Sequence, residues 1–258
     1  MNLFGCNIVN QNYGYSFKTL HFLKYKITIV LLCLALFETQ VVAQTDTIPR
    51  PSFKSFIVPA TLMSAGLVVQ GNISRDVQRQ ILTTFPGFHT KADDYLVFVP
   101  TAIPLAMSAL GIKGKHELKD QVILTVLSHG LSQSISIGLK YTIAYPRPDG
   151  VGMESFPSGH TTFAFTGAAL MSKEYGEQSV WYSVGAYSIA AGVGSLRVLN
   201  NRHWLADVLF GAGVGIASTE VVYRIYPWLK RKVFKNKNWV ALPTYSYGVG
   251  GMSIAAVF

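Results

Sequence analysis

The chain has 258 residues, half of them hydrophobic and only 14% charged, with no low-complexity linker, so one large domain is expected. This composition excludes a disordered chain, a collagen and a small disulfide scaffold, and it favours a helical membrane protein or a heavily buried helical bundle. The formal net charge is +9, but six of the 22 Lys and Arg residues lie between Arg224 and Lys237, which indicates a basic tail and not a nucleic-acid-binding face.

Residues 1–43 are predicted to be a secretory signal peptide. A lysine-containing stretch without acidic residues precedes an apolar run, Ile27–Phe37, that is too short to span a membrane, and a small-residue cleavage site ends at Ala43. An uncleaved anchor is the alternative. Both cysteines, Cys6 and Cys33, fall in this segment, so the predicted mature chain excludes disulfides, thiol catalysis and cysteine metal sites. Such an exported chain is typical of a bacterial cell envelope.

Six apolar segments follow, and most lack the strict alternation of a half-buried strand. Small residues recur in them at helical spacing, so we predict an all-α bundle of about six helices within residues 44–238. Residues 239–258 are aromatic, glycine-containing and partly alternating, which predicts a C-terminal tail or a short β-hairpin. The apolar segments are Phe56–Gln70, Tyr95–Ile112, Val122–Ala144, Thr161–Met171, Ser179–Leu196 and Trp204–Tyr226.

The hydropathy favours a membrane-bound bundle. Segments two, three, five and six are long enough to span, whereas segment four is short for a hydrocarbon core of ~30 Å. The lysines between segments two and three and the basic run after segment six would both be cytoplasmic by the positive-inside rule. A cleaved signal leaves the mature N-terminus outside, so the orientation predicted from the lysines is reversed if all six segments cross. Either segment one, broken by Pro59, enters the membrane without crossing it, or the bundle is soluble or peripheral in the periplasm.

Glycines in the last segment are predicted to pack helices together. Gly211 and Gly215 have the GxxxG spacing and lie inside an apolar helix instead of after a strand. A helix–helix contact therefore explains them better than a nucleotide-binding loop does.

Three cations at predicted helix ends point to an anionic ligand. Lys140 ends segment three, Arg147 lies between two prolines in the following turn, and Arg197 ends segment five. Cations brought together repel one another unless an anion joins them. Phosphate suits this role, because arginine binds its oxygens in pairs and lysine adds a point charge.

The remaining polar groups could carry phosphoryl chemistry. Ser158, Gly159 and His160 open segment four, where a helix N-terminus offers free N–H donors to an anion and glycine permits close approach. His203 and Asp207 are four residues apart on one helix face, so the carboxylate can hold one ring nitrogen protonated and direct the other outward as a nucleophile. His160 is then free to be the general acid.

Together these clusters resemble the type 2 phosphatidic acid phosphatase (PAP2) superfamily, which includes lipid phosphate phosphatases, class A acid phosphatases and vanadium haloperoxidases. The resemblance covers residues 121–226 and rests on motifs in order: Lys140-x6-Arg147-Pro148, Pro157-Ser158-Gly159-His160 and Arg197-x5-His203-x3-Asp207. It implies a phosphate pocket at the mouths of helices three to six.

The resemblance also implies residue roles. His203 would form a phosphohistidine, Asp207 would orient it and His160 would protonate the leaving group. Phosphate would be bound by Lys140, Arg147, Ser158, Gly159 and Arg197. One departure concerns the residue before the third-motif arginine, usually serine, which is Leu196 here. The loss of that donor would cost ~1–3 kcal/mol if nothing replaces it.

We therefore expect a phosphoric monoester hydrolase without cofactor or metal that acts on phosphomonoesters or pyrophosphates of envelope lipids. The site would face the periplasm, with a phosphorylated lipid and the membrane as partners and no nucleic acid. Alternatives are a broad-specificity periplasmic acid phosphatase, a vanadate-dependent haloperoxidase, a non-catalytic membrane scaffold, or a metal site formed by the motif histidines and Asp207. His129 is expected to be a core or supporting residue, and His89 and His116 are expected in loops.

Overall fold

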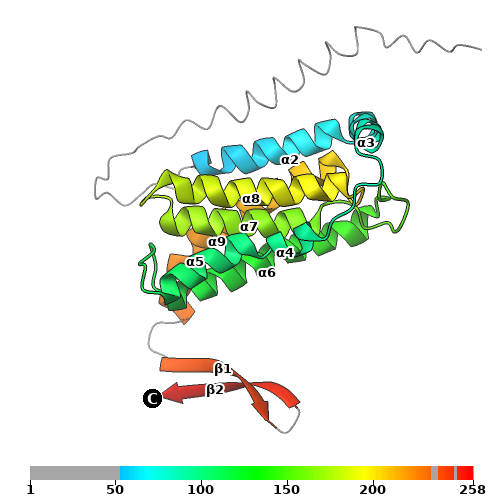
Figure 1. The fold of residues 1–258 in the computed structure, drawn as a ribbon. Helices are drawn as coiled ribbons and strands as arrows, with labels where there is room; N and C mark the ends of the chain where they lie inside the picture. The colour runs from blue at the N-terminus through cyan, green and yellow to red at the C-terminus, as the bar shows by residue number, and fades with distance from the viewer. Residues whose placement is uncertain (1–52, 234–237, 247–248, 258) are drawn as a thin grey trace, which may run out of the picture. The chain divides into compact units, whose positions relative to one another are not determined.

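The computed structural model describes residues 53–233, 238–246 and 249–257. The predicted signal peptide, with Cys6 and Cys33, lies outside the described residues and stays a prediction, as do the predicted domain boundaries. Within the described residues the chain folds into a helical bundle (Figure 1). The predicted all-α class is therefore confirmed.

The six predicted segments all become helical, and two further helices are added, the four-residue η1 (Phe53–Phe56) and the 13-residue α3 (Asn72–Thr84). The helix α3 has too many polar residues to form an apolar run, and segment two is split into α4 and α5. Pro100 lies at the start of α5, a position that proline tolerates because its missing N–H is not needed there. The helices are η1 (Phe53–Phe56), α2 (Ile57–Val69), α3 (Asn72–Thr84), α4 (Ala92–Leu96), α5 (Val99–Ala109), α6 (Leu118–Ile143), α7 (Gly159–Tyr175), α8 (Val180–Leu199) and α9 (Leu205–Val233).

The helix α7 lies at the centre of the bundle. It packs against α5, α6, α8 and α9, and most of its side chains are buried. Ala164 and Ala168 share a core cluster with Ala190 and Val193 of α8. These small side chains let neighbouring helices approach closely, so the N-terminus of α7 is held firmly between them.

Two glycines of α9 bring that helix against α7. A Cβ on Gly215 would lie 2.5 Å from the carbonyl oxygen of Thr162, and one on Gly211 would lie 2.9 Å from that of Ser158. Any side chain at either position would collide with backbone, so the packing role predicted for this pair is confirmed. The start of α9 is consequently fixed beside the start of α7.

Two described helices, α6 and α9, are long and apolar enough to cross a membrane, and α2 with α3 would add a third span if this pair, bent by 81°, counts as one. Exposed apolar side chains along α6, such as Val126 and Ile137, fit a lipid-facing surface. These features indicate a membrane-bound protein. The expectation of spanning length was wrong for α5, which has only 11 residues. Helix α8 has 20 residues but is not apolar enough to qualify.

The C-terminal segment forms the predicted hairpin. Strands β1 (Asn238–Ser246) and β2 (Val249–Val257) pair antiparallel, with Asn238 opposite Val257 and Ser246 opposite Val249.

Candidate active site

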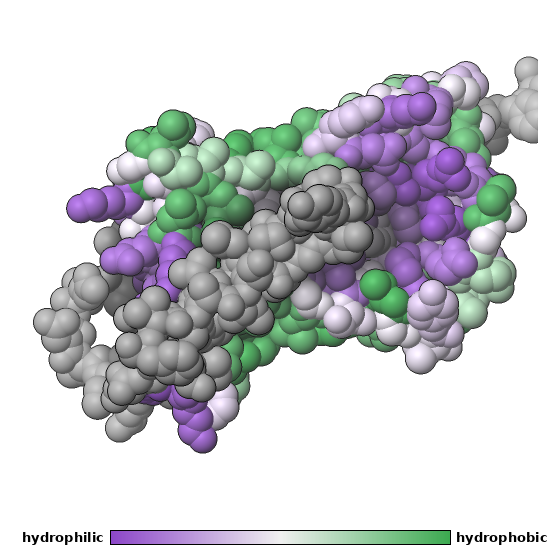
Figure 2. All heavy atoms as spheres, turned by 90° about the horizontal axis from the view of Figure 1, so that it is seen from below, coloured by the Kyte–Doolittle hydropathy of each residue, from purple (hydrophilic) through white to green (hydrophobic). Residues whose placement is uncertain are grey.

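The sequence motifs meet at the end of the bundle where α6 stops and α7 begins. Ala144, with φ of 46°, ends α6 in the left-handed region. The connection that follows is held by hydrogen bonds from the Ser155 amide to the Tyr145 carbonyl and from the Arg147 amide to the Gly152 carbonyl. Figure 2 shows hydrophilic side chains gathered at one end of the molecule, and Figure 1 places the α6–α7 connection at that same end.

The N-terminus of α7 is capped and tied to α9. The Ser158 side chain accepts hydrogen bonds from the amide and the hydroxyl of Thr161, at 3.4 and 2.9 Å. The Ser158 amide donates to the Asp207 carbonyl at 3.0 Å. A Cβ built on Gly159 would have only the Lys140 side chain within 4 Å, at 3.9 Å from its Cε. The space beside Gly159 is therefore open and bordered by Lys140.

His203 and Asp207 form the predicted pair at the start of α9. The Nδ1 atom of His203 lies 3.4 Å from Oδ2 of Asp207, and both side chains are almost fully buried. The same carboxylate oxygen accepts hydrogen bonds from the Trp204 amide at 2.9 Å and from the Ser155 hydroxyl at 2.5 Å. The carboxylate is thereby fixed, and Nε2 of His203 is the ring nitrogen left for chemistry.

Burial makes His203 a neutral base. It lowers the pKa of His203 to about 4, which outweighs the opposite effect of the Asp207 carboxylate. The positive charges of Lys140 and Arg197 act in the same direction as burial. At neutral pH the imidazole is therefore uncharged and can attack an electrophile.

The three predicted phosphate-binding cations lie within electrostatic range of one another. The charges of both Arg147 and Arg197 act on Lys140, whose ammonium donates to the Glu154 carbonyl at 2.5 Å. Among the described residues, the buried Nε atoms of Arg147 and Arg197 have no hydrogen-bond partner. Buried donors are normally paired, so this cluster has capacity for an anionic ligand.

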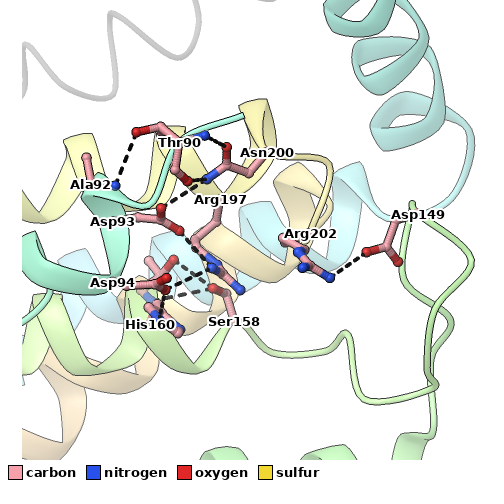
Figure 3. A network of polar contacts seen from close by, with 11 residues as sticks. Thr90, Ala92, Asp93, Asp94, Asp149, Ser158, His160, Arg197, Asn200 and Arg202 are labelled. Atoms are coloured by element: carbon pink, nitrogen blue, oxygen red, sulfur yellow. Dashed lines mark hydrogen bonds and ion pairs between the residues drawn. The ribbon is translucent and has the colours of Figure 1, made fainter. Parts of the chain in front are cut away.

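Two acidic residues that sequence reasoning missed contact this cluster from α4. Asp93 is buried, and its Oδ2 lies 2.7 Å from Nη1 of Arg197. Oδ1 of Asp94 lies 3.0 Å from Nε2 of His160 and 3.7 Å from the same Arg197 nitrogen. Asn200 completes the contact by donating to Asp93 Oδ1 at 3.0 Å. Figure 3 shows Arg197 and His160 directed toward this acidic pair.

No sequence signal pointed to these acids, because they precede an apolar segment in a short polar stretch. Ser155, which bonds Asp207, was likewise missed in a loop with no distinctive pattern. Leu196, which stands where the family usually has serine, is preceded by Ser195. Ser195 is exposed and donates to the Ala191 carbonyl at 2.9 Å, so it forms part of the helix surface.

The other histidines lie away from the motif residues. Nε2 of His129 lies 3.0 Å from the Thr101 hydroxyl, and its ring stacks on Phe163 with centroids 3.9 Å apart. His116 pairs with Glu174 at the far end of α7, and His89 is exposed.

A metal centre is not evident among the residues that the structure describes, where no group of three or more His, Asp or Glu side chains is arranged to hold an ion. His160 and His203 instead each contact a separate carboxylate.

Comparisons with known proteins give one related sequence and one similar fold. Over 169 residues the chain is 37% identical to a lipid A 1-phosphatase of Porphyromonas gingivalis, a match covering 64% of this chain and 36% of that protein. The chain thus spans about a third of the length of that relative. The fold is similar to the crystal structure of a transmembrane PAP2 type phosphatidylglycerolphosphate phosphatase from Bacillus subtilis, with a TM-score of 0.52, 20% identity, and coverage of 70% of this chain and 100% of that chain.

The family model of the PAP2 superfamily matches residues 121–231. This range contains α6, α7, α8 and most of α9, together with all three sequence motifs. Over residues 121–231 the chain is therefore similar to members of the PAP2 superfamily.

Proposed function

We propose that the protein is a phosphatase that hydrolyses phosphomonoesters or pyrophosphates of membrane lipids through a phosphohistidine at His203. The observation that carries the proposal is a buried, neutral imidazole held by Asp207 within the field of Lys140 and Arg197. A nucleophile next to fixed positive charge suits attack on a phosphate that carries negative charge.

In the first step, Nε2 of His203 attacks phosphorus as the bond from phosphorus to the lipid oxygen breaks. His160 gives its proton to that oxygen, so the lipid leaves as an alcohol. In the second step, water attacks the phosphohistidine and His160 takes a proton from it. Inorganic phosphate leaves, and the electron pair of the P–N bond returns to His203.

The positive groups are proposed to stabilise the transition state without a divalent metal. Arg147 and Arg197 can each place N–H donors on equatorial oxygens, and Lys140 adds a charge beside the open N-terminus of α7. Fixed donors directed at developing charge are usually the largest catalytic contribution of a site.

The charge distribution supports a site on the outer side of the membrane, facing the periplasm of a bacterial envelope. Lys230, in the last turn of α9, pairs with Asp120 at the start of α6. The basic end of α9 and the lysine-containing α5–α6 connection therefore lie together, whereas the site lies where α6 ends and α9 begins. The positive-inside rule assigns the basic end to the cytoplasm, and hence the site to the opposite face.

The lipid class is proposed from the setting of the site. Exposed apolar residues near it, including Tyr141, Val151 and Met153, suit contact with acyl chains at the membrane surface. The similarity to a lipid A 1-phosphatase supports a phosphorylated lipid as substrate.

The test is phosphate release by the full chain in detergent micelles, from phosphatidic acid, lipid A and the soluble ester glucose 6-phosphate. We expect the lipids to be preferred, vanadate to inhibit, and EDTA to have no effect. His203→Ala should abolish turnover, while the matched control His89→Ala, at an exposed histidine, should retain it. Full activity of His203→Ala would refute the mechanism, and preference for glucose 6-phosphate would favour a broad-specificity acid phosphatase.

A further inference from the structure

A second histidine–carboxylate pair lies beside the first. Oδ1 of Asp94 is 3.0 Å from Nε2 of His160, at the first turn of α7. The two residues are 66 positions apart in sequence, so the contact is made by the packing of α4 on α7. His160 is the proposed general acid, and Asp94 lies within hydrogen-bond distance of its ring.

The position of Asp94 is set by its neighbour. Asp93 is 1% exposed and accepts hydrogen bonds from Arg197 at 2.7 Å and from Asn200 at 3.0 Å. Asn200 also exchanges two hydrogen bonds of 2.9 Å with the backbone of Thr90. These contacts fasten α4 to the end of α8, and Asp94 is thereby presented to His160 although half of its side chain is exposed.

We propose that Asp94 is a positioning residue for the general acid, so that this site uses one carboxylate for each of its two histidines. The proposal rests on the proposed phosphatase function. Asp207 holds the nucleophile His203 through Nδ1, and Asp94 holds His160 through Nε2. The two imidazoles are thus used through opposite ring nitrogens.

The chemistry follows from the ring nitrogen that is engaged. In the imidazolium, Nε2–H donates to Asp94, and the Nδ1 proton is the one transferred to the lipid oxygen. After transfer the neutral ring keeps its proton on Nε2, still bonded to Asp94, and has a free lone pair on Nδ1. That lone pair accepts a proton from the attacking water in the second step, so the tautomer is correct for both steps.

Charges from several helices act on His160. Burial and the charge of Arg197 on α8 lower its pKa, whereas the hydrogen bond and charge of Asp94 and the charge of Asp93, both on α4, raise it. Lys140 of α6 and Asp207 of α9 also border this end of α7. Without Asp94 the balance moves toward a ring that loses its proton at lower pH.

A different role is available to Asp94 on the same geometry. Its carboxylate lies 3.7 Å from the Arg197 guanidinium, so it could occupy the place of a phosphate oxygen and compete with substrate. The two roles differ in their consequences. Removing a competitor lowers KM, whereas removing a positioning carboxylate lowers kcat and changes its pH dependence.

The decisive variant is Asp94→Asn in the full chain, assayed with phosphatidic acid and with 4-nitrophenyl phosphate. The alkoxide leaving group of the lipid needs a proton, whereas 4-nitrophenolate leaves without one. We expect kcat for phosphatidic acid to fall about 10-fold or more and that for 4-nitrophenyl phosphate to change less than about 3-fold. The alkaline limb of the phosphatidic acid profile should move to lower pH, and Asp94→Glu should restore part of the rate.

Asp149→Asn is the matched control, because this carboxylate lies at the same end of the bundle but pairs with Arg202. It should leave the alkaline limb in place. In a His160→Ala background, Asp94→Asn should have no further effect, since Asp94 acts through that ring.

An unmoved alkaline limb, equal losses with both substrates, or a lower KM with unchanged kcat would each overturn the positioning role. These results are distinguishable from failure of the proposed function, in which the wild-type chain itself would release no phosphate.

Discussion

A histidine–carboxylate pair lies beside each end of α7, His116–Glu174 at one end and His203–Asp207 at the other, and the pairs differ in how fully their neighbours are bonded. They are separated by about 20 Å of helix. At the far end, Glu174 accepts hydrogen bonds from the amide and Nδ1 of His116, both at 2.8 Å, and from the Tyr223 hydroxyl at 2.5 Å. At the motif end, Asp207 Oδ1 is buried with no partner among the described residues.

The charges around the two pairs differ in how completely they are matched by opposite charge. Around Glu174 the lysines are matched by acids, as in the ion pairs Lys173–Glu220 and Lys115–Glu177. Around Asp207 the cations cluster, and the Nε atoms of Arg147 and Arg197 have no partner within the described residues. A well-bonded polar network stabilises a fold, whereas buried donors left unpaired beside the proposed nucleophile favour a binding site. The same pair of residue types therefore serves two purposes.

The difference between the two pairs is tested most directly by substituting the carboxylate of each. Asp207→Asn should lower kcat by roughly 10³-fold or more, because the amide can no longer hold the correct tautomer of His203. Glu174→Gln should keep kcat per folded molecule within about twofold while lowering thermal stability. Phosphate release and thermal unfolding of both variants in detergent micelles measure this. Loss of turnover in Glu174→Gln at full stability would contradict the assignment.

A smaller effect is expected from a cation exchange. Arg147→Lys should lower kcat/KM about 100-fold, since a lysine keeps the charge but cannot bind two oxygens with one planar group. Arg202→Lys is its control, because Arg202 pairs with Asp149 at 3.0 Å and is partly exposed. Steady-state kinetics with phosphatidic acid should show less than a twofold change for this control. Equal effects of the two exchanges would argue against a phosphate-binding role for Arg147.

The pH dependence of kcat/KM distinguishes the roles proposed for His203 and His160. On each limb of the profile the rate should change about tenfold per pH unit. The nucleophile must be neutral, so kcat/KM should rise with pH through the pKa of His203, about 4. The acid must be protonated, so kcat/KM should fall as pH rises through the pKa of His160, which is below its ordinary 6.5. A bell with an acidic optimum is therefore expected from initial rates across the pH range. A flat profile up to pH 8 would exclude His160 as the acid.

The smallest expected effect belongs to the structural pair. Tyr223→Phe removes one hydrogen bond to Glu174 and should reduce the free energy of unfolding by about 1 kcal/mol with unchanged turnover. Thermal unfolding next to a phosphate-release assay tests both parts. A fall in kcat at unchanged stability would mean that the far end communicates with the site.

Much of the site was predictable because its residues lie at helix ends. The 3.6-residue period placed Lys140 at the end of α6, Ser158 before α7, and His203 with Asp207 at the start of α9. The GxxxG spacing predicted a packing contact, and the contact is found at Gly211 and Gly215. These are local patterns, which a short window of sequence contains.

What was not predictable depends on distant pairing. The α4 acids meet Arg197 across 104 positions, and Ser155 meets Asp207 across 52. The split of segment two into α4 and α5 was also missed, although Pro100 at the start of α5 is a local signal for a helix start. Spanning length was overestimated for segment two because its helical part, α5, has only 11 residues.

The amino-acid sequence alone determined the helical class, the ends of the main helices and the chemical character of the three motifs, because periodicity, capping and residue type act over a few neighbouring positions. Only the tertiary structure decided which cations carry an acidic partner, which histidine faces which carboxylate, and which of two similar buried pairs is complete. Those choices are made by helices that meet in space, since burial and charge pairing depend on neighbours that the chain brings together only when it folds.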